Sequence, residues 1–130
     1  MSEETRSILV VDDEESVRQL LKLLLASEPM FEIVAEAEDG VEALSLAMEH
    51  RPDYVILDYS MPRMNGEEAA RVLRTMQPEL CIVAFSSVVT ERPEWADAHL
   101  TKERYSELLP LLRQLEAQDC SVPEEPISFS

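Results

Sequence analysis

The chain has 130 residues, of which 45% are hydrophobic and 29% are charged, enough for one core of about 100–150 residues and too few for two full domains. Its 27 acidic and 11 basic residues give a net charge of −16. This charge repels phosphate backbones and anionic lipid heads, so we expect neither direct nucleic-acid binding nor membrane binding. With 2 glycines, the chain also lacks a glycine-rich loop for a nucleotide.

The N-terminus and the cysteines both favour a cytoplasmic protein. The chain begins MSEE, which places acid where a secretory signal would carry base, and no apolar run reaches the about 18 residues of a bilayer span. Cys81 lies in an apolar run and Cys120 in a polar tail, a pattern unlike a disulfide framework. We therefore expect a cytoplasmic chain without a disulfide framework.

Short β-branched runs alternate with longer stretches of helical apolar spacing, which predicts a parallel sheet covered by helices. The continuous run ILVV at 8–11 indicates a strand buried on both faces. Apolar residues then recur on one helical stripe between 17 and 25, and SEP at 27–29 ends that helix. Residues 31–35 alternate weakly, which predicts an edge strand, and Asp39-Gly40 leads into a helix over 41–50.

The second half continues the same alternation. Residues 54–58 are too apolar for a half-exposed strand and should be central, whereas Asn65-Gly66 opens a helix over 67–76. Residues 81–85 form the fourth strand and 98–101 a short fifth strand. Between them the pattern degrades, because Pro93 stands inside the expected fourth helix.

A last helix over 106–117 completes a domain that we place at residues 1–118. If Ser106 is its N-cap, Pro110 falls near the fourth helical position and removes about one backbone hydrogen bond. Residues 119–130 are rich in Ser, Pro and Glu, which predicts a flexible acidic tail.

Polar residues stand where the predicted strands end, and ligands of an open parallel sheet bind at that edge. Asp12 and Asp13 follow the first strand, Asp58 ends the third, Ser86 follows the fourth and Lys102 the fifth. Converging carboxylates need a compensating cation, and an oxygen-only set suits Mg²⁺ or Mn²⁺. An ionised Asp58 in such a cluster can attack a phosphoryl donor and form an acyl phosphate. The pattern predicts phosphoryl acceptance.

Each of these residues also has a plain structural interpretation. Asp12 and Asp13 can cap the first helix, Ser86 can cap a loop, and Lys102 can be a solvated surface residue. Their joint occurrence at matching strand ends favours the site. The leucines of the first and last helices are interpreted mainly as core, with part of the last helix left as a candidate partner surface.

The order of these segments resembles the receiver domain (CheY-like) of bacterial two-component response regulators, from about residue 7 to 117. The matching segments are ILVVDDE at 8–14, PDYVILDYSMP at 52–62, NG at 65–66, IVAFSS at 82–87 and HLTK at 99–102. The resemblance implies a doubly wound α/β fold whose five-stranded parallel sheet has the flavodoxin-like order 2-1-3-4-5.

The resemblance also implies residue roles and partners. The phosphate-facing residues would be the phosphoacceptor Asp58, the switch hydroxyl Ser86 and the paired lysine Lys102. The ligands of Mg²⁺, or of Mn²⁺, would be Asp13, Asp58, the backbone carbonyl of Ser60 and, through water, Asp12. A sensor histidine kinase or a histidine phosphotransfer protein would donate the phosphoryl group, and an unknown downstream protein would receive the signal by contact.

The sequence departs from the family pattern after the fourth strand. Glu103 follows the lysine where the family usually has proline, and His99 stands where an aromatic residue is usual. The segment between Ser86 and Lys102 is also short, and Pro93 interrupts it. We therefore expect a shortened or missing helix four.

Three functions compete for this pattern. The first is a stand-alone phosphoacceptor receiver, since the residues after 117 are too few for an output domain. Such a protein is no enzyme beyond catalysing its own phosphorylation and dephosphorylation. The second is a pseudo-receiver that binds partners without phosphorylation. The third is an acyl-phosphate hydrolase of the haloacid-dehalogenase type. That class requires a second acidic residue two positions after the nucleophile, where this chain has Ser60.

Overall fold

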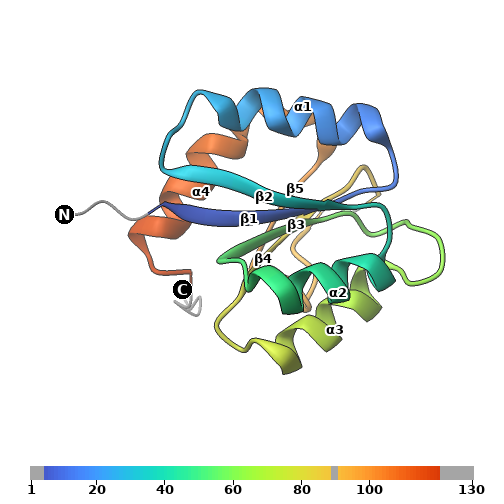
Figure 1. Ribbon diagram of the computed structural model, residues 1–130. Helices are drawn as coiled ribbons and strands as arrows, with labels where there is room; N and C mark the ends of the chain where they lie inside the picture. Colours follow the sequence, from blue (N-terminus) through green and yellow to red (C-terminus); the bar gives the residue numbers. More distant parts are fainter. Residues whose placement is uncertain (1–4, 89–90, 121–130) are drawn as a thin grey trace.

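The computed structural model describes residues 5–88 and 91–120, and element labels follow Figure 1. The strands are β1 (Arg6–Val11), β2 (Phe31–Ala37), β3 (Tyr54–Leu57), β4 (Cys81–Phe85) and β5 (Ala98–Leu100). The helices are α1 (Glu15–Ala26), α2 (Gly40–His50), α3 (Gly66–Met76), the 3₁₀ segment η1 (Lys102–Glu107) and α4 (Leu108–Ala117). The strands pair in parallel in the order β2-β1-β3-β4-β5, which confirms the predicted doubly wound α/β fold.

The helices form one layer on each face of the sheet, with α1 and α4 on one side and α2 and α3 on the other (Figure 1). Along β1, Ile8 and Val10 face the first layer, whereas Leu9 and Val11 face the second. This two-sided burial explains why the strand sequences are continuously apolar. Within residues 5–88 and 91–120, no helix is long and apolar enough to cross a membrane.

The last helix begins later than expected. The chain forms η1 first, with Arg104 outside helical geometry at φ −103° and ψ 36°, and α4 then starts at Leu108 with Glu107 rather than Ser106 at its N-cap. Pro110 is therefore the third residue of α4. The first four backbone N–H groups of an α-helix have no partner within the helix, so proline at the third position loses no helical hydrogen bond. The later start therefore avoids the cost expected for a start at Ser106.

The connection between β4 and β5 contains no helix in its described parts, residues 86–88 and 91–97. Residues 89 and 90 lie outside the described chain. The segment is held at Asp97, whose amide donates to the Ile82 carbonyl at 2.8 Å and whose Oδ2 accepts from the Ile82 amide at 2.8 Å. The same Oδ2 accepts from Nη2 of Arg74 on α3 at 2.8 Å. The expected shortening or loss of helix four therefore agrees with the described chain.

The cysteines contradict the sequence interpretation, because Cys81 and Cys120 form a disulfide with a Cα–Cα distance of 6.0 Å. Cys81 starts β4, and after α4 the chain turns back through Asp119 and Cys120, which have φ angles of 61° and 53°. This turn brings the sulfur of Cys120 to the amino end of the sheet. Residues 119 and 120 are thus tied to the domain, and residues 121–130 of the expected tail lie outside the described chain.

Candidate functional site

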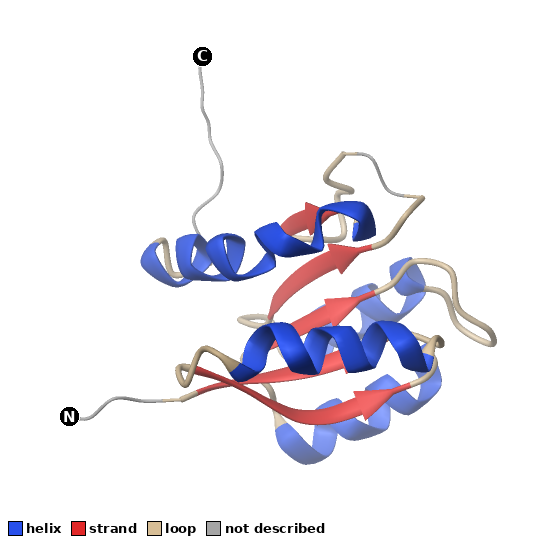
Figure 2. Cartoon of the chain, turned by 90° about the horizontal axis from the view of Figure 1, so that it is seen from above, coloured by secondary structure: helices blue, strands red, loops and turns tan. Residues whose placement is uncertain are grey.

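The polar residues that follow the strands meet at one edge of the sheet. All five strands run in the same direction, so their carboxyl ends lie on the same side in Figure 2. Asp12 comes directly after β1, Asp58 directly after β3 and Ser86 directly after β4. Lys102 comes two residues after β5, as the first residue of η1. The predicted convergence of these side chains is observed.

Three carboxylates form the acidic part of this site. Asp12, Asp13 and Asp58 each offer an oxygen, and these oxygens all lie within 4.8 Å of one another. Asp12 is 1% exposed and Asp58 is 5% exposed, whereas Asp13 is on the surface. A cluster of hard oxygen ligands with one solvent-facing member fits a divalent cation such as Mg²⁺, which keeps part of its water shell.

The ammonium of Lys102 is the positive charge that lies among these carboxylates. Its Nζ lies 2.9 Å from Oδ2 of Asp12, 3.5 Å from Oδ2 of Asp58 and 3.6 Å from Oε1 of Glu14. Although burial disfavours the ammonium, the hydrogen bond to Asp12 and the charge of Asp58 raise the pKa of Lys102 above its usual value. The lysine therefore remains charged and faces the carboxylates.

Asp58 is held in a crowded anionic environment. Burial and then the charge of Asp12 raise its pKa, against the opposing effects of Lys102, the Ser86 hydroxyl and the Tyr59 amide. The Tyr59 amide donates to Oδ1 of Asp58 at 2.8 Å. One carboxylate oxygen is therefore engaged by the backbone, and the other faces the lysine.

The remaining predicted residues are placed as follows. Ser86 is 1% exposed, its hydroxyl lowers the pKa of Asp58, and its Oγ accepts from the Val88 amide at 3.3 Å. Ser60 lies in the exposed loop after Asp58, and the role of its carbonyl as a ligand stays a prediction. Ser86 thus caps its loop with an oxygen that also influences the acceptor.

The capping interpretation of the acidic pair receives partial support. Oδ1 of Asp12 accepts from the Glu14 amide at 2.9 Å, which orders the turn before α1. The N-cap of α1 is Glu14, and no side chain caps it. Asp12 therefore divides its two oxygens between the turn and Lys102, and Asp13 stays exposed beside them.

Two supporting features were not predicted as parts of the site. Arg18 donates from Nη1 to the backbone carbonyl of Asp12 at 2.7 Å and from Nε to Glu36 at 3.0 Å, which fastens the acidic turn to β2. Tyr59 stacks on Trp95, with ring centroids 6.3 Å apart. The sequence contains one tryptophan, but nothing in the pattern indicated its partner, because residues 59 and 95 belong to different connections.

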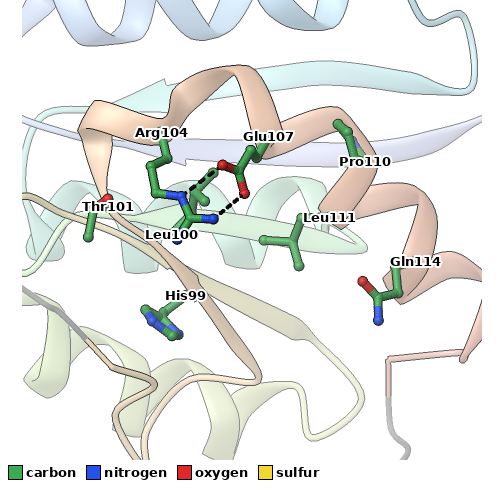
Figure 3. A pocket seen from close by; sticks show the side chains of 8 residues that line it. All are labelled: His99, Leu100, Thr101, Arg104, Glu107, Pro110, Leu111 and Gln114. Atoms are coloured by element: carbon green, nitrogen blue, oxygen red, sulfur yellow. Dashed lines mark hydrogen bonds and ion pairs between the residues drawn. The ribbon is translucent and has the colours of Figure 1, made fainter.

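Apart from the acidic cluster, a hollow lies on the face formed by β5, η1 and α4 (Figure 3). It has a volume of about 340 Å³ and is lined by His99, Leu100, Thr101, Arg104, Glu107, Pro110, Leu111 and Gln114. Arg104 and Glu107 are joined across its upper side by two hydrogen bonds of 2.8 Å. Neither Asp58 nor another carboxylate of the acidic cluster lines this hollow.

The family is shown by comparison with known proteins. The family model of the response regulator receiver domain matches residues 8–102, so the chain belongs to this family. A protein-glutamate methylesterase/protein-glutamine glutaminase from Pyrococcus horikoshii is 42% identical over 98 residues, covering 75% of this chain and 26% of that protein. The transcriptional regulatory protein PdtaR from Mycobacterium tuberculosis is 39% identical over 113 residues, covering 82% of this chain and 55% of that protein.

Solved structures agree with this assignment. The response regulator domain of Thermotoga maritima CheB matches with a TM-score of 0.80 at 28% identity, covering 93% of this chain and all of that one (100%). The response regulator TrrA from the same organism, in complex with Mg²⁺ and BeF, matches with a TM-score of 0.77 at 34% identity, covering 85% and 99%. The curated relatives above are longer proteins, of which this chain spans about a quarter and about half.

Proposed function

We propose that this receiver domain accepts a phosphoryl group on Asp58 and passes the signal by protein contact. The observation that carries the proposal is the position of the Asp58 carboxylate, whose Oδ2 lies 3.5 Å from Nζ of Lys102 and which belongs to the same oxygen cluster as Asp12 and Asp13. A nucleophilic carboxylate, a charged lysine and a set of cation ligands are the groups that phosphoryl acceptance requires.

The chemical step transfers one phosphoryl group. An oxygen of the Asp58 carboxylate forms a bond to phosphorus as the bond between phosphorus and the donor's imidazole nitrogen breaks, and the electron pair of that bond stays on the nitrogen. The product is an acyl phosphate. Lys102 and the Ser86 hydroxyl, both within reach of Asp58, offer hydrogen bonds to the phosphoryl oxygens, where the negative charge gathers.

The ligands proposed for Mg²⁺, or for Mn²⁺, are Asp13, Asp58 and the carbonyl of Ser60, with Asp12 acting through water. A bound divalent cation would neutralise charge on the phosphoryl oxygens and on the carboxylates. The all-oxygen donor set of the three aspartates supports this assignment. The domain's own residues supply the nucleophile, the ammonium and the hydroxyl.

We propose a sensor histidine kinase or a histidine phosphotransfer protein as the phosphoryl donor, in the cytoplasm, and a downstream protein as the target. The net charge of −16 supports protein partners over nucleic acid or an anionic membrane. The activities of the longer relatives belong to those proteins. The domain itself is proposed to catalyse only its own phosphorylation and dephosphorylation.

Intact-mass spectrometry after incubation with Mg²⁺ and phosphoramidate tests this proposal. We expect one added phosphoryl group, no addition without the metal and none in Asp58→Asn, which keeps the side-chain volume and removes the nucleophile. A chain that gains no phosphate would be a phosphorylation-independent pseudo-receiver. Rapid turnover of the donor without accumulation would favour a hydrolase, although Ser60 occupies the place where that class wants a second acid.

A further inference from the structure

Trp95 and Tyr59 connect two loops that border the phosphoacceptor. Their rings are stacked, with centroids 6.3 Å apart and planes inclined by 23°, which is within the range of offset aromatic pairs. Trp95 belongs to the β4–β5 connection, and Tyr59 directly follows Asp58. Both side chains are partly buried, so neither is a freely moving surface ring.

Tyr59 is fixed at three points. Its amide donates to Oδ1 of Asp58 at 2.8 Å, its carbonyl accepts from the Gly66 amide at 2.8 Å, and its ring packs on Trp95. The first contact sets the orientation of the acceptor, because a carboxylate whose Oδ1 is bound to this amide turns Oδ2 toward Lys102. A shift of the Tyr59 backbone would therefore rotate the nucleophile.

Trp95 is mounted on a firmly held segment. The neighbouring Ala96 is 2% exposed, and its amide donates to the Pro93 carbonyl at 3.1 Å. The next residue, Asp97, is bound to both Ile82 and Arg74. These contacts attach the segment to β4 and α3, so the indole ring is a fixed surface against which Tyr59 can be positioned.

We propose that Trp95 is a positioning residue for the phosphoacceptor. Its stack holds Tyr59 so that the Tyr59 amide keeps Asp58 in the orientation that presents Oδ2 to the incoming phosphoryl group. This role rests on the proposed phosphorylation of Asp58. It concerns the rate of that step, because in this proposal Trp95 acts on Asp58 only through Tyr59.

The test compares phosphorylation rates, measured by intact mass with Mg²⁺ and phosphoramidate, in the wild type and in four variants. Trp95→Ala and Tyr59→Leu each remove the stack and should slow the reaction two- to tenfold, since an aromatic pair contributes about 0.5–1.5 kcal/mol beyond its buried area. Trp95→Phe keeps a ring and should restore most of the rate. Tyr105→Ala removes an exposed aromatic residue of η1 and should leave the rate unchanged.

A double variant separates positioning from general destabilisation. If Trp95 acts through Tyr59, then Trp95→Ala combined with Tyr59→Leu is no slower than the slower single variant. The proposal would be overturned if the double variant were slowed by the product of the two single effects. It would also be overturned by a wild-type rate in Trp95→Ala, or by a rate in Trp95→Phe as low as that in Trp95→Ala. Where Trp95→Ala fails to fold by circular dichroism, Tyr59→Leu and Trp95→Phe carry the test.

The same experiment distinguishes failure of this inference from failure of the proposed function. If the wild type gains no phosphate, the proposed function is wrong. If the wild type is phosphorylated and the loss of either ring leaves its rate unchanged, only the positioning role is wrong. Trp95 is the one tryptophan of the chain, so its emission gives an independent signal, which should change on phosphorylation in the wild type and not in Tyr59→Leu.

Discussion

Removal of the Cys81–Cys120 disulfide should lower the stability of the domain by an amount that the structure allows to be calculated. The bond joins residues separated by 39 positions. In the chain-entropy treatment, closing a loop of this length removes about 13 cal/mol/K from the unfolded chain, which corresponds to about 4 kcal/mol at 25 °C. For a domain of this size, a loss of 4 kcal/mol lowers the melting temperature by roughly 10–20 °C.

The assay is urea unfolding of the oxidised wild type, the reduced wild type and Cys120→Ser. Intact mass after alkylation first establishes the oxidation state of each sample. The two forms without the bond should have similar midpoints, both below that of the oxidised protein, because they share an unconstrained unfolded chain. Cys120 packs partly buried against the core, so any difference between them measures the packing of its sulfur.

The calculation fails if a protein with a verified disulfide has the same urea midpoint before and after reduction. It would fail equally if reductant lowered the midpoint of Cys120→Ser, which has no bond to lose. A loss well below 4 kcal/mol, with the expected order of midpoints, would instead indicate residual structure in the reduced unfolded chain.

The other predictions concern three separate parts of the fold. Gly66→Ala should cost about 1–3 kcal/mol in urea unfolding, because a Cβ there would press on the backbone carbonyl of Asp58; an unchanged midpoint would contradict this. Burial and then the hydrogen bond to Glu116 raise the pKa of Tyr54. The stabilisation that the protonated Tyr54 hydroxyl gives to the folded domain is therefore fully present below about pH 10, the pKa in the unfolded chain, and is lost at higher pH. Tyr54→Phe should weaken the alkaline fall in the free energy of unfolding. An identical pH profile in the variant would refute the assignment. Millimolar Mg²⁺ should raise the melting temperature in scanning calorimetry and have no such effect in Asp13→Ala; an equal rise in both would argue against this ligand.

The sequence was sufficient to predict the sheet and the meeting of its functional side chains. Continuous apolar runs mark strands buried on both faces, and the polar residue after each run is placed by topology alone, because parallel strands end at the same edge. Asp12, Asp58 and Ser86 follow this rule directly. Asn65-Gly66 was also informative, since Asn65 forms a capping box with Glu68 at the start of α3.

The features that escaped prediction depend on contacts between distant segments. Cys81 and Cys120 lie in segments of unlike polarity, and only the turn after α4 brings them together. The stack of Tyr59 on Trp95 joins two irregular connections that have no periodicity to analyse. The start of α4 was missed because Ser106 is a local capping signal, whereas the observed start at Leu108 places Pro110 in the first turn, where its missing N–H is not needed.

The ion pairs of Lys102 indicate how the site would respond to phosphorylation. In the unphosphorylated domain the lysine is closer to Asp12, at 2.9 Å, than to Asp58, at 3.5 Å. Two buried carboxylates therefore share one ammonium, and the raised pKa of Asp58 follows from its burial and then from the charge of Asp12, which this single ammonium does not fully neutralise. Under the proposed function, a phosphoryl group on Asp58 would bring further negative charge to the same edge of the sheet. The ammonium of Lys102 has three N–H donors and could then share them between that group and Asp12, so the start of η1 would be directly coupled to the state of Asp58.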